Sequence, residues 1–166
     1  MAFCVGDMVV YGIHGVCRIV GLERRVVDRK SIEYFVLEPT NTAVAKFYVP
    51  TQNPVAVAKM RKVLTKEALN GLLDSREIRE NNWIADENAR KDKYRQLITR
   101  ANCAELIPMI RALYIHKQQQ LSAGKKFHLC DENFLKDAQR LICTEVSQVL
   151  GIAPEEVGPY IQSRIE

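Results

Sequence analysis

Short apolar runs separated by polar turns fill the first fifty residues. Four runs are rich in β-branched and aromatic side chains, at residues 9–11, 16–22, 33–37 and 46–49. Turn-forming residues separate them, at 6–7, 12–15, 28–31 and 39–42. Because no helical periodicity lies between the runs, the pattern predicts four or five antiparallel strands in a small, strongly bent barrel.

The spacing of apolar residues becomes helical beyond residue 54. Thr65 is placed to cap a short helix over residues 66–73. Ser75 is placed to begin a longer helix that runs through Trp83 to about Ile98. The sequence therefore predicts that Trp83 lies on a helix, among mostly polar and charged neighbours such as Asn81 and Asn82.

Two more helices follow from apolar residues that recur every three or four positions, over 106–114 and 134–146. Gly151 is placed to end the second of them, and Pro154 to open a last short helix. The whole pattern predicts an α+β fold, in which a small antiparallel β-barrel of the SH3 or Tudor kind precedes an all-helical bundle. We expect the β-domain to span residues 1–52, a linker 53–64 and the helical domain 65–166.

Composition narrows the class of protein. No segment approaches the roughly 20 consecutive apolar residues of a membrane span, and the first residues do not resemble a secretory signal. The five cysteines are scattered without a CxxC pair, so a disulfide framework or zinc knuckle is not indicated. The net charge of +4 permits a polyanionic partner, although acidic residues are interspersed throughout. We expect a cytoplasmic monomer with no metal or cofactor.

Catalytic motifs have little support. His14 with Cys17, and His128 with Cys130, are spaced closely enough to share a metal, but a closed zinc site would have to combine both domains. A loop histidine and a buried thiol are the simpler interpretation of each pair. The glycines of residues 12–15 precede another strand rather than a helix, so they do not form a phosphate-binding loop. The sequence therefore predicts a binding protein rather than an enzyme.

Trp83 is the only tryptophan and has two interpretations. Pattern alone favours a core anchor that packs with Ile78 and Leu97. Alternatively, Trp83 is an exposed wedge, with Arg90 and Lys91 about two helical turns further on to neutralise phosphates. Those two charges are equally compatible with an ordinary solvated helix face.

Two further basic clusters are candidates for binding. Lys125 and Lys126 lie in the loop before a helix that Asp131 is placed to cap, where they suit a phosphate clamp or, as pattern alone favours, simple solubility. Arg24 and Arg25 lie near a predicted hairpin. The edge of a short sheet can pair with a strand of another chain, and the arginines would then stabilise that contact by their charge. Alternatively, the arginines protect an exposed barrel edge from such pairing.

Several motifs together resemble the CarD/CdnL family of bacterial transcription regulators over nearly the whole chain. Residues 3–11 contain Phe-x-Val-Gly-Asp-x-Val-Val-Tyr, followed by His-Gly-Val at 14–16, Glu-x-Arg at 23–25, Glu-Tyr-x-Val-Leu at 33–37 and Val-Pro at 49–50. The helical half contributes Trp83, Arg-x-Leu-Tyr at 111–114, Leu-Ser at 121–122 and Lys-Lys at 125–126. The first motifs alone also resemble the polymerase-interacting domain of the transcription-repair coupling factor, whereas the tryptophan-bearing helical half favours CarD/CdnL.

This resemblance implies a function that composition cannot show. Members of the family are not enzymes; they bind RNA polymerase at promoters, with the Tudor-like domain on the lobe of the β subunit. Their helical domain meets promoter DNA at the upstream edge of the melted region, where a tryptophan enters the minor groove with little sequence preference and slows collapse of the open complex. The resemblance also implies association with the nucleoid through the polymerase.

Carried over position by position, the resemblance makes Trp83 the wedge and Arg25 a polymerase contact, with Arg24 beside it. Tyr48 stands where some relatives have a basic residue, so part of that interface differs here or is supplied by Lys46. Many relatives have basic residues directly after the tryptophan, whereas residues 84–87 here are Ile-Ala-Asp-Glu.

We therefore expect the phosphate contacts at Arg90, Lys91, Lys125 and Lys126. The main alternative is an adaptor of RNA polymerase or sigma factor in which Trp83 is buried and DNA is not contacted.

Overall fold

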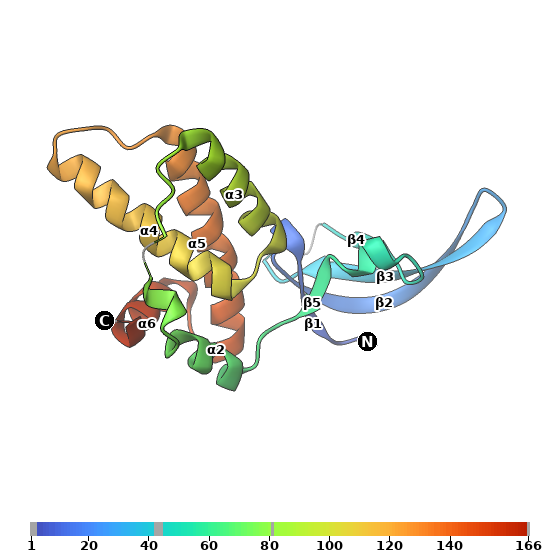
Figure 1. Ribbon diagram of the computed structural model, residues 1–166. Helices are drawn as coiled ribbons and strands as arrows, with labels where there is room; N and C mark the ends of the chain where they lie inside the picture. Colours follow the sequence, from blue (N-terminus) through green and yellow to red (C-terminus); the bar gives the residue numbers. More distant parts are fainter. Residues whose placement is uncertain (1–2, 42–44, 81, 166) are drawn as a thin grey trace. The chain divides into compact units, whose positions relative to one another are not determined.

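The computed structural model describes residues 3–41, 45–80 and 82–165. The chain divides into two compact units, Met1–Val63 and Leu64–Glu166. The first unit holds the strands and the second holds the long helices (Figure 1). The predicted α+β class, with an antiparallel sheet before a helical bundle, is confirmed.

The first unit is built on a five-stranded antiparallel sheet. Its strands are β1 (Met8–Tyr11), β2 (Val16–Val27), β3 (Lys30–Pro39), β4 (Phe47–Pro50) and β5 (Met60–Lys62), in the order β4-β3-β2-β1-β5. β2 and β3 are longer than the apolar runs that predicted them, because charged residues occupy the end of the hairpin (Figure 1). The predicted turn at 39–42 ends at Thr42, which lies outside the described residues.

A two-residue turn joins β2 to β3, where the sequence predicts a hairpin. Val27 pairs with Lys30, and Asp28 and Arg29 between them have φ angles of 50° and 65°. Two consecutive residues in the left-handed region match the right-handed twist of the flanking strands, as in a type I′ turn. The turn therefore fixes the register of the whole hairpin.

One apolar core serves all five strands. It consists of buried side chains from each strand: Val9, Cys17, Ile19, Phe35, Leu37, Val49 and Met60. β4 and β5 lie at opposite ends of the sheet order, yet Val49 and Met60 belong to the same cluster. The sheet therefore curves around a single core, with an irregularity between Ile19 and Gly21 that increases the bend.

The segment predicted as a linker, 53–64, is instead largely structured. Helix α1 (Pro54–Val57) is capped by Asn53, whose side-chain oxygen accepts hydrogen bonds from the amides of Val55 and Ala56. Strand β5 then pairs with β1 and buries Met60. The prolines marked a boundary in the sequence, but a proline at the first helical position starts a helix rather than a linker.

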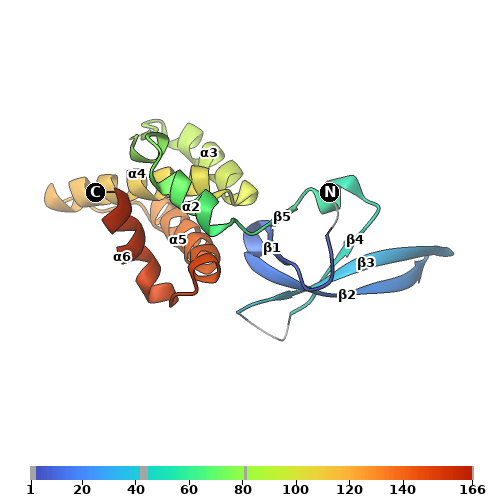
Figure 2. The ribbon, with the colours of Figure 1, turned by 90° about the horizontal axis from the view of Figure 1, so that it is seen from below.

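The described residues of the second unit form five longer helices and one 3-10 turn. They are α2 (Lys66–Leu73), η2 (Glu77–Arg79), α3 (Glu87–Arg100), α4 (Cys103–Ser122), α5 (Leu129–Leu150) and α6 (Pro154–Ile165). α5 packs against α2, α3, α4 and α6 and so forms the centre of the bundle (Figure 2). Thr65 caps α2, Gly151 ends α5 and Pro154 opens α6, as predicted.

The long helix predicted from Ser75 through Trp83 does not form. Ser75 donates its hydroxyl to the carbonyl of Leu72, and only the short η2 follows. α3 begins at Glu87, where the carboxylate of Asp86 accepts the amide of Ala89 at 2.8 Å. An aspartate at the N-cap and an acidic residue in the first turn both stabilise a helix that begins at this point. The residues before Asp86 therefore stay outside the helix.

Trp83 therefore lies in a connecting segment, residues 82–86, rather than on a helix. Asn81, named above as its polar neighbour, lies outside the described residues. A second correction concerns α5: His128 occupies the cap position, and Asp131 is buried in the first turn instead of capping the helix.

Candidate functional site

Trp83 is half-buried, and its ring is held by polar groups rather than by an apolar core. The imidazole of His116, on α4, stacks on the indole with ring centroids 3.9 Å apart and an interplanar angle of 15°. The guanidinium carbon of Arg90, on α3, lies 4.6 Å from the indole centroid. The structure therefore matches neither a fully buried anchor nor a freely exposed side chain.

Arg90 is a buried structural residue, which corrects its prediction as a surface phosphate contact. Its exposed fraction is 4%, and that of its partner Asp131 is 1%. The two side chains make a bidentate pair, with Nε to Oδ1 at 3.0 Å and Nη2 to Oδ2 at 2.9 Å. Nη1 donates to the carbonyl of Ile84 at 3.0 Å, directly after Trp83. The guanidinium thus joins α3, α5 and the segment that carries the tryptophan.

The same surroundings favour the neutral form of His116. Burial lowers the pKa of the imidazole, and the positive charge of Arg90 lowers it further. Asp131 acts in the opposite direction, and His128 adds a small lowering effect. The Nε2 atom of His116 lies 3.2 Å from the side-chain amide of Gln120. Trp83 therefore stacks on an imidazole ring whose surroundings favour the uncharged form.

Phe127 brings the loop between α4 and α5 to this cluster. Its ring centroid lies 6.2 Å from that of His116, and the ammonium of Lys117 lies 5.9 Å from the Phe127 ring. Lys125 and Lys126 precede it in the same loop and are exposed. Within the described part of the chain their ammonium groups form no ion pair. The structure thus brings two separately predicted clusters, at residue 83 and at 125–126, into one region.

Lys91 is less available than these two lysines. Its ammonium lies 3.0 Å from a carboxylate oxygen of Glu87, one helical turn earlier on α3. That carboxylate has a lowered pKa because it accepts a hydrogen bond from Lys91. An exposed pair at this spacing is weak and exchanges readily, so Lys91 remains a candidate cation.

The predicted polymerase contacts lie on the sheet of the first unit. The guanidinium carbon of Arg25, on β2, lies 4.2 Å from the ring centroid of Tyr48, on β4. Tyr34 meets Tyr48 edge to face at 6.4 Å, and Glu23 accepts a hydrogen bond from Arg25 at 3.1 Å. We call these four residues, Glu23, Arg25, Tyr34 and Tyr48, the Arg25–Tyr48 face.

Arg24 lies outside that face. Arg24 follows the alternation of β2 to the opposite side of the sheet, where it pairs with Glu33 at 3.7 Å. Lys46 is exposed just before β4. Sequence reasoning grouped Arg24 with Arg25, although successive residues of a strand point to opposite faces.

The suggested metal pairs have ordinary structural surroundings. His14 stacks with Tyr11 and Phe47, and burial raises the pKa of the Cys17 thiol to about 11. No group of three or more potential metal ligands occurs among residues 3–41, 45–80 and 82–165. In the same described ranges, no helix has the length and apolar character that crossing a membrane requires.

Comparison with known proteins identifies the first unit. Residues 3–64 match the family model described as CarD-like/TRCF RID domain. This match supports an RNA polymerase-interacting protein related to transcription. More narrowly, the first unit matches the polymerase-interacting domain that CarD-like proteins share with TRCF, a protein-interaction domain, and the predicted resemblance is confirmed over these residues. A search of curated proteins found no match to the chain.

Proposed function

We propose that the protein acts as a monomer without catalysis, docks on RNA polymerase at promoters and stabilises the open complex with Trp83. The observation that carries this proposal is the half-buried indole, which His116 and Arg90 contact beside a loop with two exposed lysines. The first unit supplies attachment to the polymerase. The second unit supplies the preference for melted DNA.

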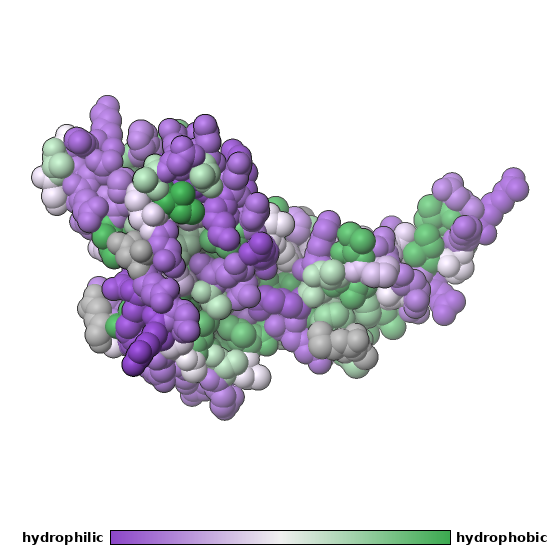
Figure 3. Space-filling view, in the orientation of Figure 1, coloured by the Kyte–Doolittle hydropathy of each residue, from purple (hydrophilic) through white to green (hydrophobic). Residues whose placement is uncertain are grey.

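For docking, the proposed surface is the Arg25–Tyr48 face, and the proposed partner is the lobe of the β subunit. Arginine and tyrosine are the residue types that contribute most to protein interfaces, because each combines a large flat surface with hydrogen-bond donors. Exposed apolar side chains also occur along the hairpin (Figure 3). Of these, Val27 lies on the same side of β2 as Arg25, whereas Leu22 and Val26 alternate to the side of Arg24. Exposed apolar residues on a long hairpin are typical of an interaction surface.

For DNA, the proposed contact is the minor groove at the upstream edge of the bubble. Unstacking a base step costs a few kcal/mol, so a wedge acts best where the duplex is already distorted. Contact between an aromatic ring and a base is worth about 1–3 kcal/mol, which corresponds to one or two decades in open-complex lifetime at most. Lys125, Lys126 and Lys91 would neutralise nearby phosphates with little dependence on sequence.

Tethering makes such a weak contact effective. A ligand shifts an equilibrium only by its difference in affinity for the two states. Docking on the polymerase raises the local concentration of the second unit at the promoter, so a small preference for the open state is sufficient.

The stack between Trp83 and His116 favours a second candidate. In an adaptor of polymerase or sigma factor, Trp83 would stay against His116 and never leave it for DNA. Phe127 and Lys117 next to the stack would then contribute to a protein interface.

Trp83→Ala distinguishes the two candidates. We expect this variant to bind polymerase normally and to lose most of the effect on open-complex lifetime, measured by competitor challenge of preformed promoter complexes. Trp83→Phe, which keeps an aromatic ring, is expected to retain part of the effect. Unchanged lifetimes with both variants would favour the adaptor.

A further inference from the structure

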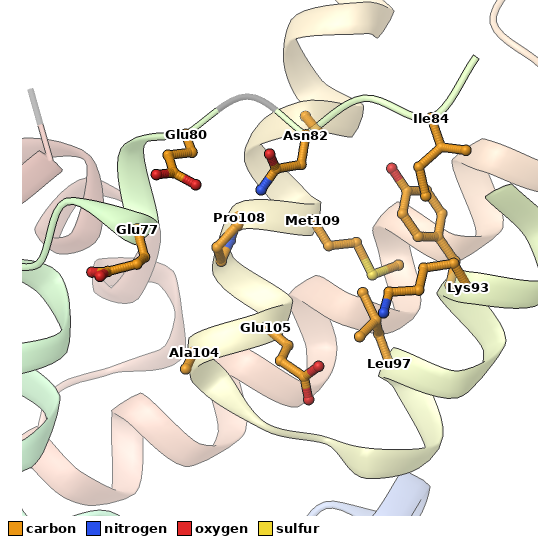
Figure 4. A pocket seen from close by; sticks show the side chains of 12 residues that line it. Glu77, Glu80, Asn82, Ile84, Lys93, Leu97, Ala104, Glu105, Pro108 and Met109 are labelled. Carbon is orange, nitrogen blue, oxygen red and sulfur yellow. The ribbon is translucent and has the colours of Figure 1, made fainter.

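A cavity of about 400 Å³, open to solvent, lies on the second unit beside the segment that carries Trp83 (Figure 4). Three parts of the chain form its walls: the segment that contributes Glu77, Glu80, Asn82 and Ile84, helix α3 and helix α4. This volume is within the range of small-molecule sites, which are commonly 300–1,000 Å³ with apolar walls and a few polar groups.

The cavity has an acidic end and a basic end. Glu77 and Glu80 lie at one end and Lys93 at the other, with Pro108 and Met109 between them (Figure 4). None of the three charged side chains makes an ion pair within the described part of the chain. Glu105 also lines the cavity, but Arg100 neutralises it at 2.7 Å. The free charges therefore favour a ligand with a cation at one end and an anion at the other.

Tyr94 supplies an independent indication of a ligand. This residue follows Lys93 on α3, lines the cavity and is only 2% exposed. Its hydroxyl is buried and has no hydrogen-bond partner among the residues that the structure describes. Burial raises the pKa of Tyr94 to about 12, so the group remains a neutral O–H donor. Buried hydroxyl groups are normally paired, and a ligand carboxylate would provide the missing acceptor.

We propose that this cavity binds a small zwitterion whose ammonium and carboxylate groups are separated by an apolar stem. The ammonium would face Glu77 and Glu80, and the carboxylate would accept hydrogen bonds from Lys93 and Tyr94. The stem would lie on Pro108, Met109 and Leu97. The site stands apart from the proposed function, since it requires neither polymerase nor DNA.

Trp83 is a natural reporter for the site. Asn82 and Ile84, on either side of it, both line the cavity. Tyr94 lies one helical turn beyond Arg90, which contacts the indole. A bound ligand is therefore expected to change the emission of the single tryptophan.

The test uses the full chain and three matched probes: 6-aminohexanoate, hexylammonium and hexanoate. Binding is measured by calorimetry and by tryptophan emission, with 4-aminobutanoate and 8-aminooctanoate added to vary the stem length. We expect 6-aminohexanoate to bind at least about tenfold more tightly than either half-ligand, because each end adds a charge-assisted hydrogen bond. Equal affinity for all three probes would overturn the proposal.

Two sets of variants test which residues bind the ammonium end of the ligand and which bind the carboxylate end. Glu77→Gln with Glu80→Gln should weaken hexylammonium and leave hexanoate unchanged, whereas Lys93→Met should do the reverse. Tyr94→Phe should fold at least as stably as the parent and weaken hexanoate several-fold. Glu155→Gln with Glu156→Gln, on α6, makes the same charge change away from the cavity and should alter nothing. Equal weakening by that control pair, or tighter binding of a lysine-containing peptide than of 6-aminohexanoate, would contradict a zwitterion site.

Discussion

Each unit places an arginine over an aromatic ring, but the surroundings of the two guanidinium groups differ. Arg25 lies 4.2 Å from the centre of Tyr48 on a sheet surface, with 47% of its side chain exposed. Arg90 lies 4.6 Å from the centre of Trp83 and is buried against Asp131. Both Arg25 and Tyr48 therefore remain accessible to a binding partner. Arg90 instead positions the Trp83 ring, so only that ring is accessible to a partner.

The largest expected effect comes from breaking the buried pair. Asp131→Ala leaves the Arg90 charge buried without a partner, and loss of one member of such a pair typically costs about 3–5 kcal/mol. We therefore expect the free energy of unfolding, measured by urea denaturation, to fall by about this amount. The combination Arg90→Met with Asp131→Leu should be less harmful than Asp131→Ala alone, since no unpaired charge remains.

The exposed arginine provides the matched control. Arg25→Met removes the equivalent cation from the Arg25–Tyr48 face, and we expect the urea midpoint to stay that of the parent protein. Should the two single variants lose equal stability, the contrast between a positioning arginine and an available one would be wrong.

The next effect concerns polymerase binding. Arg25→Glu reverses the charge at the centre of the proposed docking face, and we expect binding to purified polymerase to weaken by about tenfold or more in a pull-down titration. Arg24→Glu makes the same change on the opposite side of the sheet, so its effect should be much smaller. Similar losses from both variants would mean that net charge, rather than this face, governs docking.

A smaller effect is expected at His116. Removing the imidazole by His116→Ala frees one contact of the Trp83 ring, and an aromatic pair is worth about 0.5–1.5 kcal/mol. We expect stronger iodide quenching of Trp83 and a change of roughly twofold to tenfold in open-complex lifetime. His116→Phe preserves a stacking surface and should restore both properties. If quenching is the same in all three proteins, His116 does not hold the indole.

The sequence predicted the elements whose signals are local. Four kinds of prediction depend only on neighbouring residues, and all of them are confirmed: the strand runs, the hairpin turn at 28–31, the Thr65 cap and the helix end at Gly151. Strand β5 was missed because two of its three residues are basic, so only its pairing with β1 reveals it. The start of α3 was missed because the sequence offers two residues that can cap a helix, Ser75 and Asp86, eleven positions apart. The prediction used the first, whereas the helix begins after the second.

The candidate site depends on contacts that are distant in sequence. Arg90 and Asp131 are separated by 41 positions, and no spacing rule connects them. His116 precedes a polar stretch of α4, and nothing in its spacing connects it with Trp83. Counting helical turns from Trp83 then placed Arg90 on the surface, an error that followed from the wrong helix boundary.

The smallest expected effect is a dependence of stability on pH. Burial and the Arg90 charge lower the pKa of His116 below its ordinary value of 6.5. The unfolded chain therefore takes up the proton at a higher pH than the folded chain, and stability should fall as the pH falls through about 6.5. Above that value the contribution of the neutral imidazole is fully present. His116→Phe cannot titrate here, so the difference in unfolding free energy between this variant and the parent should change between pH 8 and pH 5. If the difference stays constant over this range, the imidazole of His116 has the same pKa in the folded and unfolded chains. The stack on Trp83 then does not require a neutral ring.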